Sequence, residues 1–240
     1  MKWMIASDIH GSAYYCRQLL NAYNREQADR LLLLGDLLYH GPRNDLPEEY
    51  DPKQVIELLN AKKQHILCVR GNCDAEVDQM VLQFPIMADY CAIADGDTLI
   101  YATHGHTYNE QNLPPLHRGD ILLHGHTHVP ACVPHDTYTC MNPGSVAIPK
   151  AGSWHGYLIM ENGRFQWKTM TNEVKMEFEN AFSKQTLLRK HKCLLHSGHT
   201  SQAVPLPDRI RRSSPVHRWS LPVSVPFSKV SHIQRNRGLR

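Results

Sequence analysis

Short apolar runs alternate with polar segments in the first half of the chain, and their lengths predict an α/β protein. Three runs are four or five residues long, which suits buried strands better than helices; they lie at residues 3–7, 31–34 and 66–69. After the first run, Ser12 can cap a helix that presents Tyr15, Leu19 and Tyr23 on one face. After the second, Asp51-Pro52 provides an N-cap followed by proline at the first helical position. This order predicts a β-α-β-α-β unit with a parallel sheet and crossover helices.

After residue 85 the pattern changes to short strands separated by turns. Asp95-Gly96 and Asn162-Gly163 are hairpin signals between apolar runs. Further short strands are predicted at residues 121–123, 131–133 and 138–140. The second half is therefore expected to be largely antiparallel. Two facing sheets with helices outside would accommodate both patterns.

The charge distribution divides the chain near residue 180. Residues 181–240 hold 12 of the 26 Lys and Arg residues but only Asp208 of the 23 Asp and Glu residues. This segment also contains five prolines and nine serines, and it has no sustained apolar periodicity. Such a composition predicts a disordered basic tail, apart from a short helix at residues 187–195. We expect a folded domain at residues 1–180, and we favour disorder over a dedicated nucleic-acid module for the tail.

The seven cysteines are scattered, odd in number and without a Cys-x-x-Cys pair. This excludes a disulfide framework and a zinc ribbon, and it fits a reducing compartment. The apolar stretch before Asp8 is too short for a signal peptide, and no run is long enough to cross a membrane. The sequence therefore predicts a cytoplasmic protein.

Seven side chains that can bind metals follow short apolar runs in a fixed order. In α/β proteins, strands that end in such residues commonly build one site, so we expect the seven to converge. Two divalent ions in one site can clamp a phosphoryl group, with a bridging hydroxide as the nucleophile. The predicted ligands are Asp8, His10, Asp36, Asn72, His104, His126 and His128.

The chemistry of these residues suggests how they could share two ions. Asp36 is the natural bridge, because it is the lone carboxylate at its strand end. Asp8 and His10 would reach one ion from an extended backbone, while His126 and His128 could divide between the ions if the chain turns. Two carboxylates leave room for a hydroxide and an anionic phosphate. Oxygen and nitrogen ligands without a thiolate suit manganese, iron or zinc.

In this order, Asp-x-His, Gly-Asp, Gly-Asn-x-Asp, His and Gly-His-x-His resemble the signature of the calcineurin-like metallophosphoesterases. Five segments are more narrowly similar to the YfcE-type bacterial phosphodiesterases, at residues 8–12, 41–44, 70–74, 103–106 and 142–145. The resemblance extends over roughly residues 1–170. It implies an α/β fold, a four-layer α/β/β/α sandwich of two mixed sheets.

The resemblance also implies hydrolysis of small phosphodiesters by two divalent ions, with manganese favoured over zinc or iron. By the family pattern, one ion would be held by Asp8, His10, Asp36 and His128. The other would be held by Asp36, Asn72, His104 and His126. Relatives often oligomerise, so a homo-oligomer is an open expectation.

Cys73 departs from the family pattern, because many relatives have a histidine there that protonates the leaving group. A thiol is a weaker acid than imidazolium and a poor hydrogen-bond donor. The sequence thus predicts that hydrolysis depends on substrates with good leaving groups, or on a metal-bound water as the proton donor. The alternative is that Cys73 only packs beside the site. Asp74 is expected to orient site groups. Arg43 could bind a phosphate oxygen, or could be a solvated residue of a turn.

Two other functions remain open at this point. One is hydrolysis of a phosphomonoester or nucleotide at the same site. The other is a metal-free protein-binding scaffold, as in a retromer subunit that shares the fold. All seven ligand positions hold competent residues, which favours the enzyme.

Overall fold

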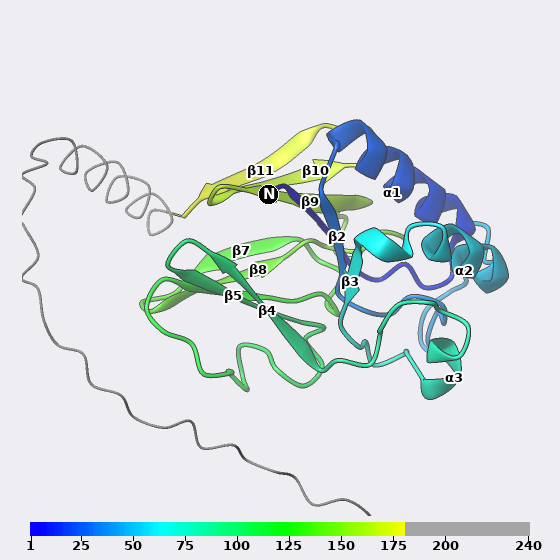
Figure 1. Cartoon of the computed structure of the whole chain (residues 1–240), viewed down its shortest axis with the longest axis horizontal. Coiled ribbons are helices and arrows are strands. Elements are labelled where there is room, and N and C mark those ends of the chain that lie inside the picture. The colour runs from blue at the N-terminus through cyan, green and yellow to red at the C-terminus, as the bar shows by residue number, and fades with distance from the viewer. Residues whose placement is uncertain (181–240) are drawn as a thin grey trace, which may run out of the picture. The chain divides into compact units, whose positions relative to one another are not determined.

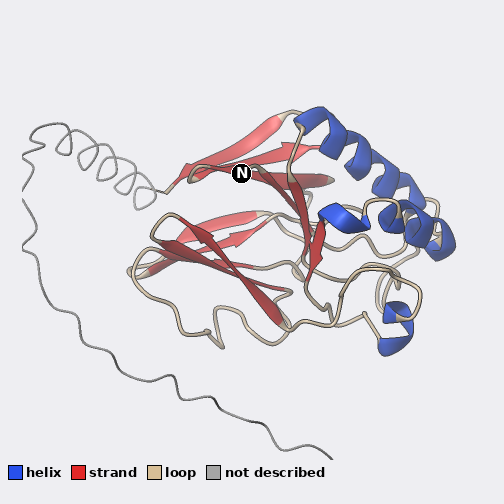
Figure 2. Ribbon diagram, in the orientation of Figure 1, coloured by secondary structure: helices blue, strands red, loops and turns tan. Residues whose placement is uncertain are grey.

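Two mixed β-sheets face each other in the computed structural model, which describes residues 1–180 (Figure 1 and Figure 2). The helical segments are α1 (Ala13–Glu26), α2 (Pro52–Asn60), the short 3₁₀ helix η1 (Lys63–His65) and α3 (Glu76–Gln79). The strands are β1 (Trp3–Ala6), β2 (Arg30–Leu33), β3 (Ile66–Cys68), β4 (Tyr90–Asp95), β5 (Thr98–Thr103), β6 (Asp120–Leu123), β7 (Ala131–Pro134), β8 (Tyr138–Asn142), β9 (Gly156–Glu161), β10 (Arg164–Thr169) and β11 (Val174–Glu179).

The first sheet has the strand order β11-β10-β9-β1-β2-β3. Strands β1, β2 and β3 are parallel, as the β-α-β-α-β pattern predicts, and β9, β10 and β11 add antiparallel strands on the other side of β1. The second sheet has the order β4-β5-β6-β8-β7. Both sheets are mixed, so the predicted fold class is confirmed.

The second half of the chain differs from the prediction in two respects. The hairpins β4–β5 and β9–β10 are present, but β5, β6 and β8 pair in parallel at the centre of the second sheet. Turn signals mark hairpins, whereas parallel pairing joins strands that are distant in sequence and leaves no local signal. Strand β11 was not predicted, because four of its six residues are exposed and its pattern is weak.

The core between the sheets is built from alternate residues of the strands. Ile5, Leu32, Leu158, Phe165 and Trp167 point into it and are fully buried. Burial of each such side chain contributes about 1.5–3 kcal/mol relative to exposure. The intervening residues of β1, β2 and β9 face the other way, into a second core beneath the helices.

Helices α1 and α2 cover the outer face of the first sheet (Figure 2). The predicted caps are both present. The Ser12 side chain accepts a hydrogen bond from the Tyr15 N–H, and the Asp51 side chain accepts one from the Gln54 N–H. Pro52 begins α2, as predicted.

The outer face of the second sheet is covered by the loop between β5 and β6. Tyr108 and Leu116 of this loop pack against Tyr101, Leu122 and Tyr138. The segment after Asp74 forms only the single turn α3, which starts at Glu76. The Asp74 carboxylate accepts hydrogen bonds from the backbone of the loop after β2.

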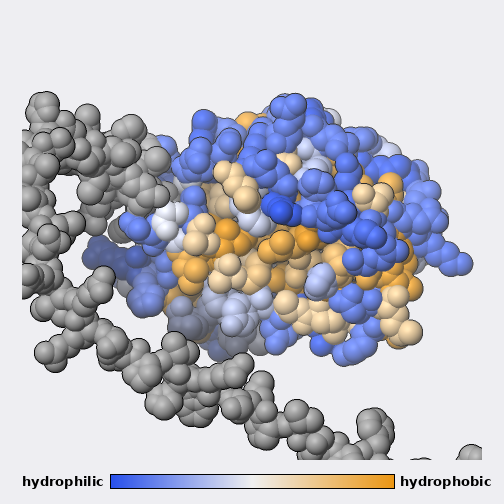
Figure 3. Space-filling model, viewed as in Figure 1, coloured by the Kyte–Doolittle hydropathy of each residue, from blue (hydrophilic) through white to orange (hydrophobic). Residues whose placement is uncertain are grey.

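On the face shown in Figure 3, hydrophilic residues gather over the helices, and hydrophobic residues form a band near the level where the two sheets meet. Among residues 1–180, no helix combines the length and apolar character needed to cross a membrane. The predicted basic tail and its short helix at residues 187–195 lie outside the described residues.

A buried ion-pair network joins α1 to the first sheet. The Glu26 carboxylate accepts hydrogen bonds from Lys2 Nζ at 3.0 Å, Lys168 Nζ at 2.7 Å and the Tyr157 hydroxyl at 3.0 Å. Burial alone would raise the pKa of Glu26, but the bonds from Lys168 and Lys2 outweigh it and lower the pKa below its ordinary value. The charged form of Glu26 therefore stabilises the fold.

We expect Glu26→Gln to lower the free energy of unfolding by about 2–4 kcal/mol at pH 7, because it leaves two lysines without their buried partner. A carboxyl with a lowered folded pKa stabilises above its unfolded pKa, and the effect is lost as the pH falls through the folded value. The deficit of the variant should thus shrink below about pH 4. Urea denaturation of both proteins at a series of pH values measures this difference in the free energy of unfolding.

The control is Glu57→Gln on the exposed face of α2, which should change stability by less than about 0.5 kcal/mol. Equal losses for Glu26→Gln and Glu57→Gln, or a Glu26→Gln deficit that does not depend on pH, would contradict this account of the network.

Candidate metal centre

Five loops, each following the carboxyl end of a strand, place their polar residues at one end of the two sheets. Within each sheet the strands concerned are parallel, so their carboxyl ends lie at the same edge. The loops follow β1, β2 and β3 in the first sheet and β5 and β6 in the second. They bring together all seven residues singled out in the sequence, the seven-residue cluster: Asp8, His10, Asp36, Asn72, His104, His126 and His128.

One half of the cluster is formed around two imidazoles. The Nε2 atoms of His10 and His128 are 3.3 Å apart. Asp8 Oδ1 lies 3.3 Å from His128 Nε2 and 3.6 Å from His10 Nε2. Asp36 Oδ2 lies 3.7 Å from His10 Nε2. Among these side chains, Asp8, His10 and His128 offer ligand atoms close enough together to hold a metal ion.

The other half shares the Asp36 carboxylate. Asp36 Oδ2 is 3.4 Å from His104 Nε2, which lies 3.0 Å from Asn72 Oδ1. His126 Nδ1 is 3.2 Å from His104 Nε2. A single carboxylate oxygen therefore faces donor atoms in both halves.

Backbone carbonyls fix the orientation of three of the four histidines. The Nδ1 atoms of His10, His104 and His128 each lie 2.7 Å from a carbonyl oxygen. A carbonyl can only accept, so each Nδ1 carries a hydrogen and each Nε2 is turned toward the cluster. Histidines that bind metals are commonly held in this way.

The arrangement calls for a positive charge at its centre. The lone pairs of His10 Nε2 and His128 Nε2 face each other, and a proton or metal ion between them removes their repulsion. Asp8 Oδ1 is buried and has no hydrogen-bond partner among the described residues. A buried carboxylate oxygen without a hydrogen bond is costly unless a cation compensates it. The donor set of oxygens and imidazole nitrogens suits divalent ions such as manganese, iron or zinc, so the residues fit the metals that the sequence predicts.

The pKa values of the cluster residues also indicate that a positive charge is favoured at its centre. Burial alone would lower the pKa of His104, but contact with Asp36 and the charge of Asp8 raise it to about 9. Burial would raise the pKa of Asp8, but its contacts with His10 and His128 and the charge of His104 hold it well below the ordinary value. Surroundings that stabilise a proton on an imidazole also stabilise a metal ion in its place.

The backbone at the cluster is strained, contrary to the extended conformation that we expected for Asp8 and His10. Five of the seven residues have positive φ, and they make up half of the ten non-glycine residues with positive φ in the described part of the chain. Such conformations are uncommon, cost about 1–3 kcal/mol each and gather at functional sites. The five are Asp8, His10, Asp36, His126 and His128.

Asp74 lies beneath the cluster rather than in it. Its carboxylate is buried and accepts hydrogen bonds from the backbone N–H groups of Asp36 at 2.8 Å, Leu37 at 2.9 Å and Gly71 at 2.7 Å. These bonds hold the loop after β2 against the loop after β3. A Cβ on Gly71 would lie 2.1 Å from Asp36 Oδ1, so only glycine permits this approach. The Asp74 carboxylate thus contacts the backbone of both loops, and the orienting role expected for it stays a prediction.

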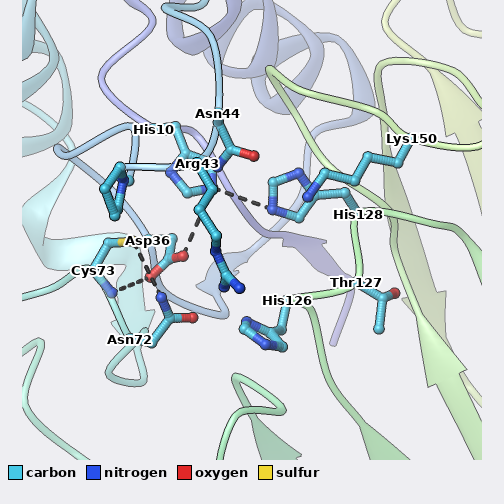
Figure 4. Close-up of a pocket in the computed structure, with 12 residues that line it drawn as sticks. His10, Asp36, Arg43, Asn44, Asn72, Cys73, His126, Thr127, His128 and Lys150 are labelled. Carbon is cyan, nitrogen blue, oxygen red and sulfur yellow. Dashed lines mark hydrogen bonds and ion pairs between the residues drawn. The ribbon is translucent and has the colours of Figure 1, made fainter.

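A pocket of about 530 Å³ opens beside the cluster (Figure 4). Arg43 is exposed and extends into it from the loop after β2, and Lys150 extends into it from the opposite side (Figure 4). Sequence reasoning missed Lys150, because nothing local distinguishes it from a solvated surface residue. The lining residues are His10, Asp36, Gly41, Pro42, Arg43, Asn44, Asn72, Cys73, His126, Thr127, His128 and Lys150.

Cys73 lines the pocket next to the shared carboxylate. Its backbone N–H donates to Asp36 Oδ1 at 2.8 Å, and its Sγ accepts from Asn72 Nδ2 at 3.2 Å. Burial and the charge of Asp36 raise the pKa of the thiol to about 12. The thiol of Cys73 therefore stays protonated at neutral pH.

The chain resembles known phosphoesterases over most of its length. The model of the calcineurin-like phosphoesterase superfamily domain matches residues 1–163. Phosphodiesterase YfcE of Escherichia coli (strain K12) is 45% identical over 162 residues, which cover 68% of this chain and 88% of that protein. A solved structure of YfcE, a phosphoesterase from E. coli, is 40% identical with a TM-score of 0.73, and the match covers 75% of this chain and 100% of that one.

We expect Asp74→Asn to lower the free energy of unfolding by about 2–4 kcal/mol, because an amide cannot accept all three backbone hydrogen bonds. With Asp36 less firmly placed, affinity for manganese should fall about 10- to 100-fold. Denaturant titration and calorimetric metal titration measure the two effects.

Asp78→Asn is the matched control. Asp78 is close to Asp74 in sequence, but it accepts only the Ala75 N–H at the start of α3. The Asp78→Asn variant should therefore bind manganese as tightly as the unsubstituted protein. Equal metal affinity in Asp74→Asn and the unsubstituted protein would show that Asp74 does not position the cluster.

Proposed function

The chain belongs to the calcineurin-like phosphoesterase superfamily, and from that membership we propose that it hydrolyses small phosphodiesters with two divalent ions held by the seven-residue cluster. Its sequence is 45% identical to that of YfcE over 88% of that protein, which supports a metal-dependent phosphodiesterase. The finer proposal concerns the number of ions, the ligands of each and the roles of the pocket residues.

One observation carries the proposal of two ions. Asp36 Oδ2 faces His10 Nε2 at 3.7 Å in one half of the cluster and His104 Nε2 at 3.4 Å in the other. A carboxylate in this position can bind two cations at once. We assign Asp8, His10, Asp36 and His128 to one ion, and Asp36, Asn72, His104 and His126 to the other.

Bound divalent ions would neutralise charge on the phosphoryl oxygens and supply a water of lowered pKa as the nucleophile. The protein's own part is to hold the substrate in place. We propose that the Arg43 guanidinium binds a phosphate oxygen, since it extends into the pocket and has no ion-pair partner among the described residues. We favour manganese, with zinc and iron as alternatives, because the ligands are oxygen and nitrogen atoms.

Protonation of the leaving group is the weakest part of the machinery. Cys73 occupies the position from which a general acid would act, but a thiol is a weaker acid than imidazolium and a poor hydrogen-bond donor. Asp74 cannot replace it, because its carboxylate is buried beneath the pocket and engaged by three backbone groups. We propose that the enzyme relies on substrates whose leaving groups need little protonation, or on a water in the pocket.

A phosphomonoester is the second candidate substrate, and the Asn72→Ala variant tests the site in both cases. Loss of the Asn72 oxygen should reduce bound manganese from two ions to one per chain, in calorimetric titration. The value of kcat/KM for bis-nitrophenyl phosphate should fall about 100-fold or more. Asn24→Ala, on the exposed face of α1, is the control and should change neither quantity.

The same assay with nitrophenyl phosphate, with each of manganese, zinc and iron, decides the substrate class and the preferred metal. Higher kcat/KM for the monoester under every metal would replace the diesterase proposal with the phosphomonoesterase one. Two ions still bound by Asn72→Ala would contradict the assignment of Asn72.

We expect Cys73→His to increase turnover of substrates with poor leaving groups, because imidazolium is a stronger acid than a thiol. The gain should be about tenfold or more for an alkyl diester and small for a nitrophenyl diester, whose leaving group needs no proton. Turnover of a series of diesters with different leaving groups measures this gain in Cys73→His, and Cys73→Ser is the control. Equal leaving-group dependence in all three proteins would indicate that Cys73 only packs beside the site.

A further inference from the structure

We propose that Lys150 forms an anion subsite in the pocket and selects phosphodiesters that carry a second negative charge on the group retained after hydrolysis. This inference rests on the proposed diesterase function and specifies its substrate class. Lys150 belongs to none of the sequence motifs, and it enters the site only through the fold.

The backbone of Lys150 is fixed to the seven-residue cluster. Its N–H donates to the His128 carbonyl at 3.2 Å, and the Ile148 carbonyl, two residues earlier, accepts from His128 Nδ1 at 2.7 Å. Ser145 Oγ donates to the Asp8 carbonyl at 2.9 Å and accepts from the Ile148 N–H at 2.9 Å. The segment that carries Lys150 is thus bound to two residues of the cluster, which sets where its side chain begins.

The side chain extends from this segment into the pocket, toward His128 and opposite Arg43 (Figure 4). Lys150 has no ion-pair partner among the described residues. Asp36 is the one carboxylate in the pocket lining, and both its oxygens are engaged, Oδ1 by the Cys73 N–H and Oδ2 by His10 and His104. The protein therefore leaves the Lys150 charge to be matched by a ligand.

The rest of the lining favours a polar, anionic substrate. Apart from Pro42 and the cluster histidines His10, His126 and His128, the lining contains no aromatic or large aliphatic side chain. A pocket of about 530 Å³ is larger than one phosphate group needs. With Arg43 placed for the scissile phosphate, Lys150 remains for a second anionic group, a carboxylate or a phosphate, on the same substrate.

The test compares three chromogenic diesters with the same nitrophenolate leaving group. The retained group is ethyl, 2-carboxyethyl or choline, so it is neutral, anionic or cationic. In the manganese-loaded enzyme at low salt, we expect KM for the carboxyethyl diester to be about fivefold lower than for the ethyl diester, the size of a partly exposed ion pair. The choline diester should have the highest KM, and the preference should weaken as salt is raised.

Lys150→Met should abolish this preference, while Lys150→Arg should retain it. Lys53→Met removes an exposed lysine of α2 outside the pocket and should have no effect. Binding gives a second readout that does not depend on turnover. In calorimetry, 2-carboxyethyl phosphate should bind about fivefold more tightly than ethyl phosphate, and Lys150→Met should equalise the two.

Replacing the carboxyethyl group by 2-phosphoethyl distinguishes the two kinds of anion, and a preference for either supports the subsite. Equal KM for the ethyl and carboxyethyl diesters in the unsubstituted enzyme would overturn the inference while leaving the diesterase proposal intact. So would an equal effect of Lys150→Met on all three diesters, which would mean that Lys150 contacts the scissile phosphate. Failure to hydrolyse any of the diesters with any metal would instead refute the proposed function itself.

Discussion

The position of the Asp36 carboxylate is the constraint on which the site depends. One of its oxygens faces both halves of the seven-residue cluster, so a small displacement would disturb both at once. The other oxygen is held by the Cys73 N–H, and the backbone of Asp36 is held by Asp74. Asp74 is thus a buried charge that is satisfied entirely by backbone N–H groups, which strengthens each of these hydrogen bonds. The chain fixes its shared carboxylate with a second carboxylate that never reaches the pocket.

This geometry requires close approach between loops from different strands. Gly71 admits the Asp36 carboxylate, and a Cβ on Gly125 would lie 1.9 Å from Ser7 Oγ. Five cluster residues accept positive φ, which would destabilise an isolated loop. The burial of the inter-sheet core offsets that strain, because the strands that lead into these loops are among the most deeply buried of the fold. Packing between the sheets therefore holds the cluster in a conformation that the loops alone would avoid.

The polar side chains that the sequence singled out lie together in the structure, whereas part of the strand pairing was not predicted. Side chains such as Asp36 and His104 were identifiable because each follows an apolar run, and parallel strands bring such positions to one edge. The parallel pairing of β5, β6 and β8 was missed, since the turns beside them resemble those of hairpins. The extended backbone expected at Asp8 was wrong, because φ is set there by contacts with distant loops and not by the local residues. Lys150 was missed because contacts with a distant loop bring it to the pocket, and no local motif marks it.

The charges around the pocket are unevenly distributed, and this has a consequence for substrate choice. The anionic side chains of the cluster, Asp8 and Asp36, are turned toward the positions where cations would bind, so metal ions would neutralise them. Arg43 and Lys150 are then left facing the open pocket without an ion-pair partner among the described residues. A neutral alcohol group on the substrate would gain nothing from these charges, whereas an anionic one would be attracted over roughly a Debye length of 8–10 Å. The proposed discrimination among diesters thus depends on Lys150, which lies outside the seven-residue cluster and can vary without disturbing the shared carboxylate.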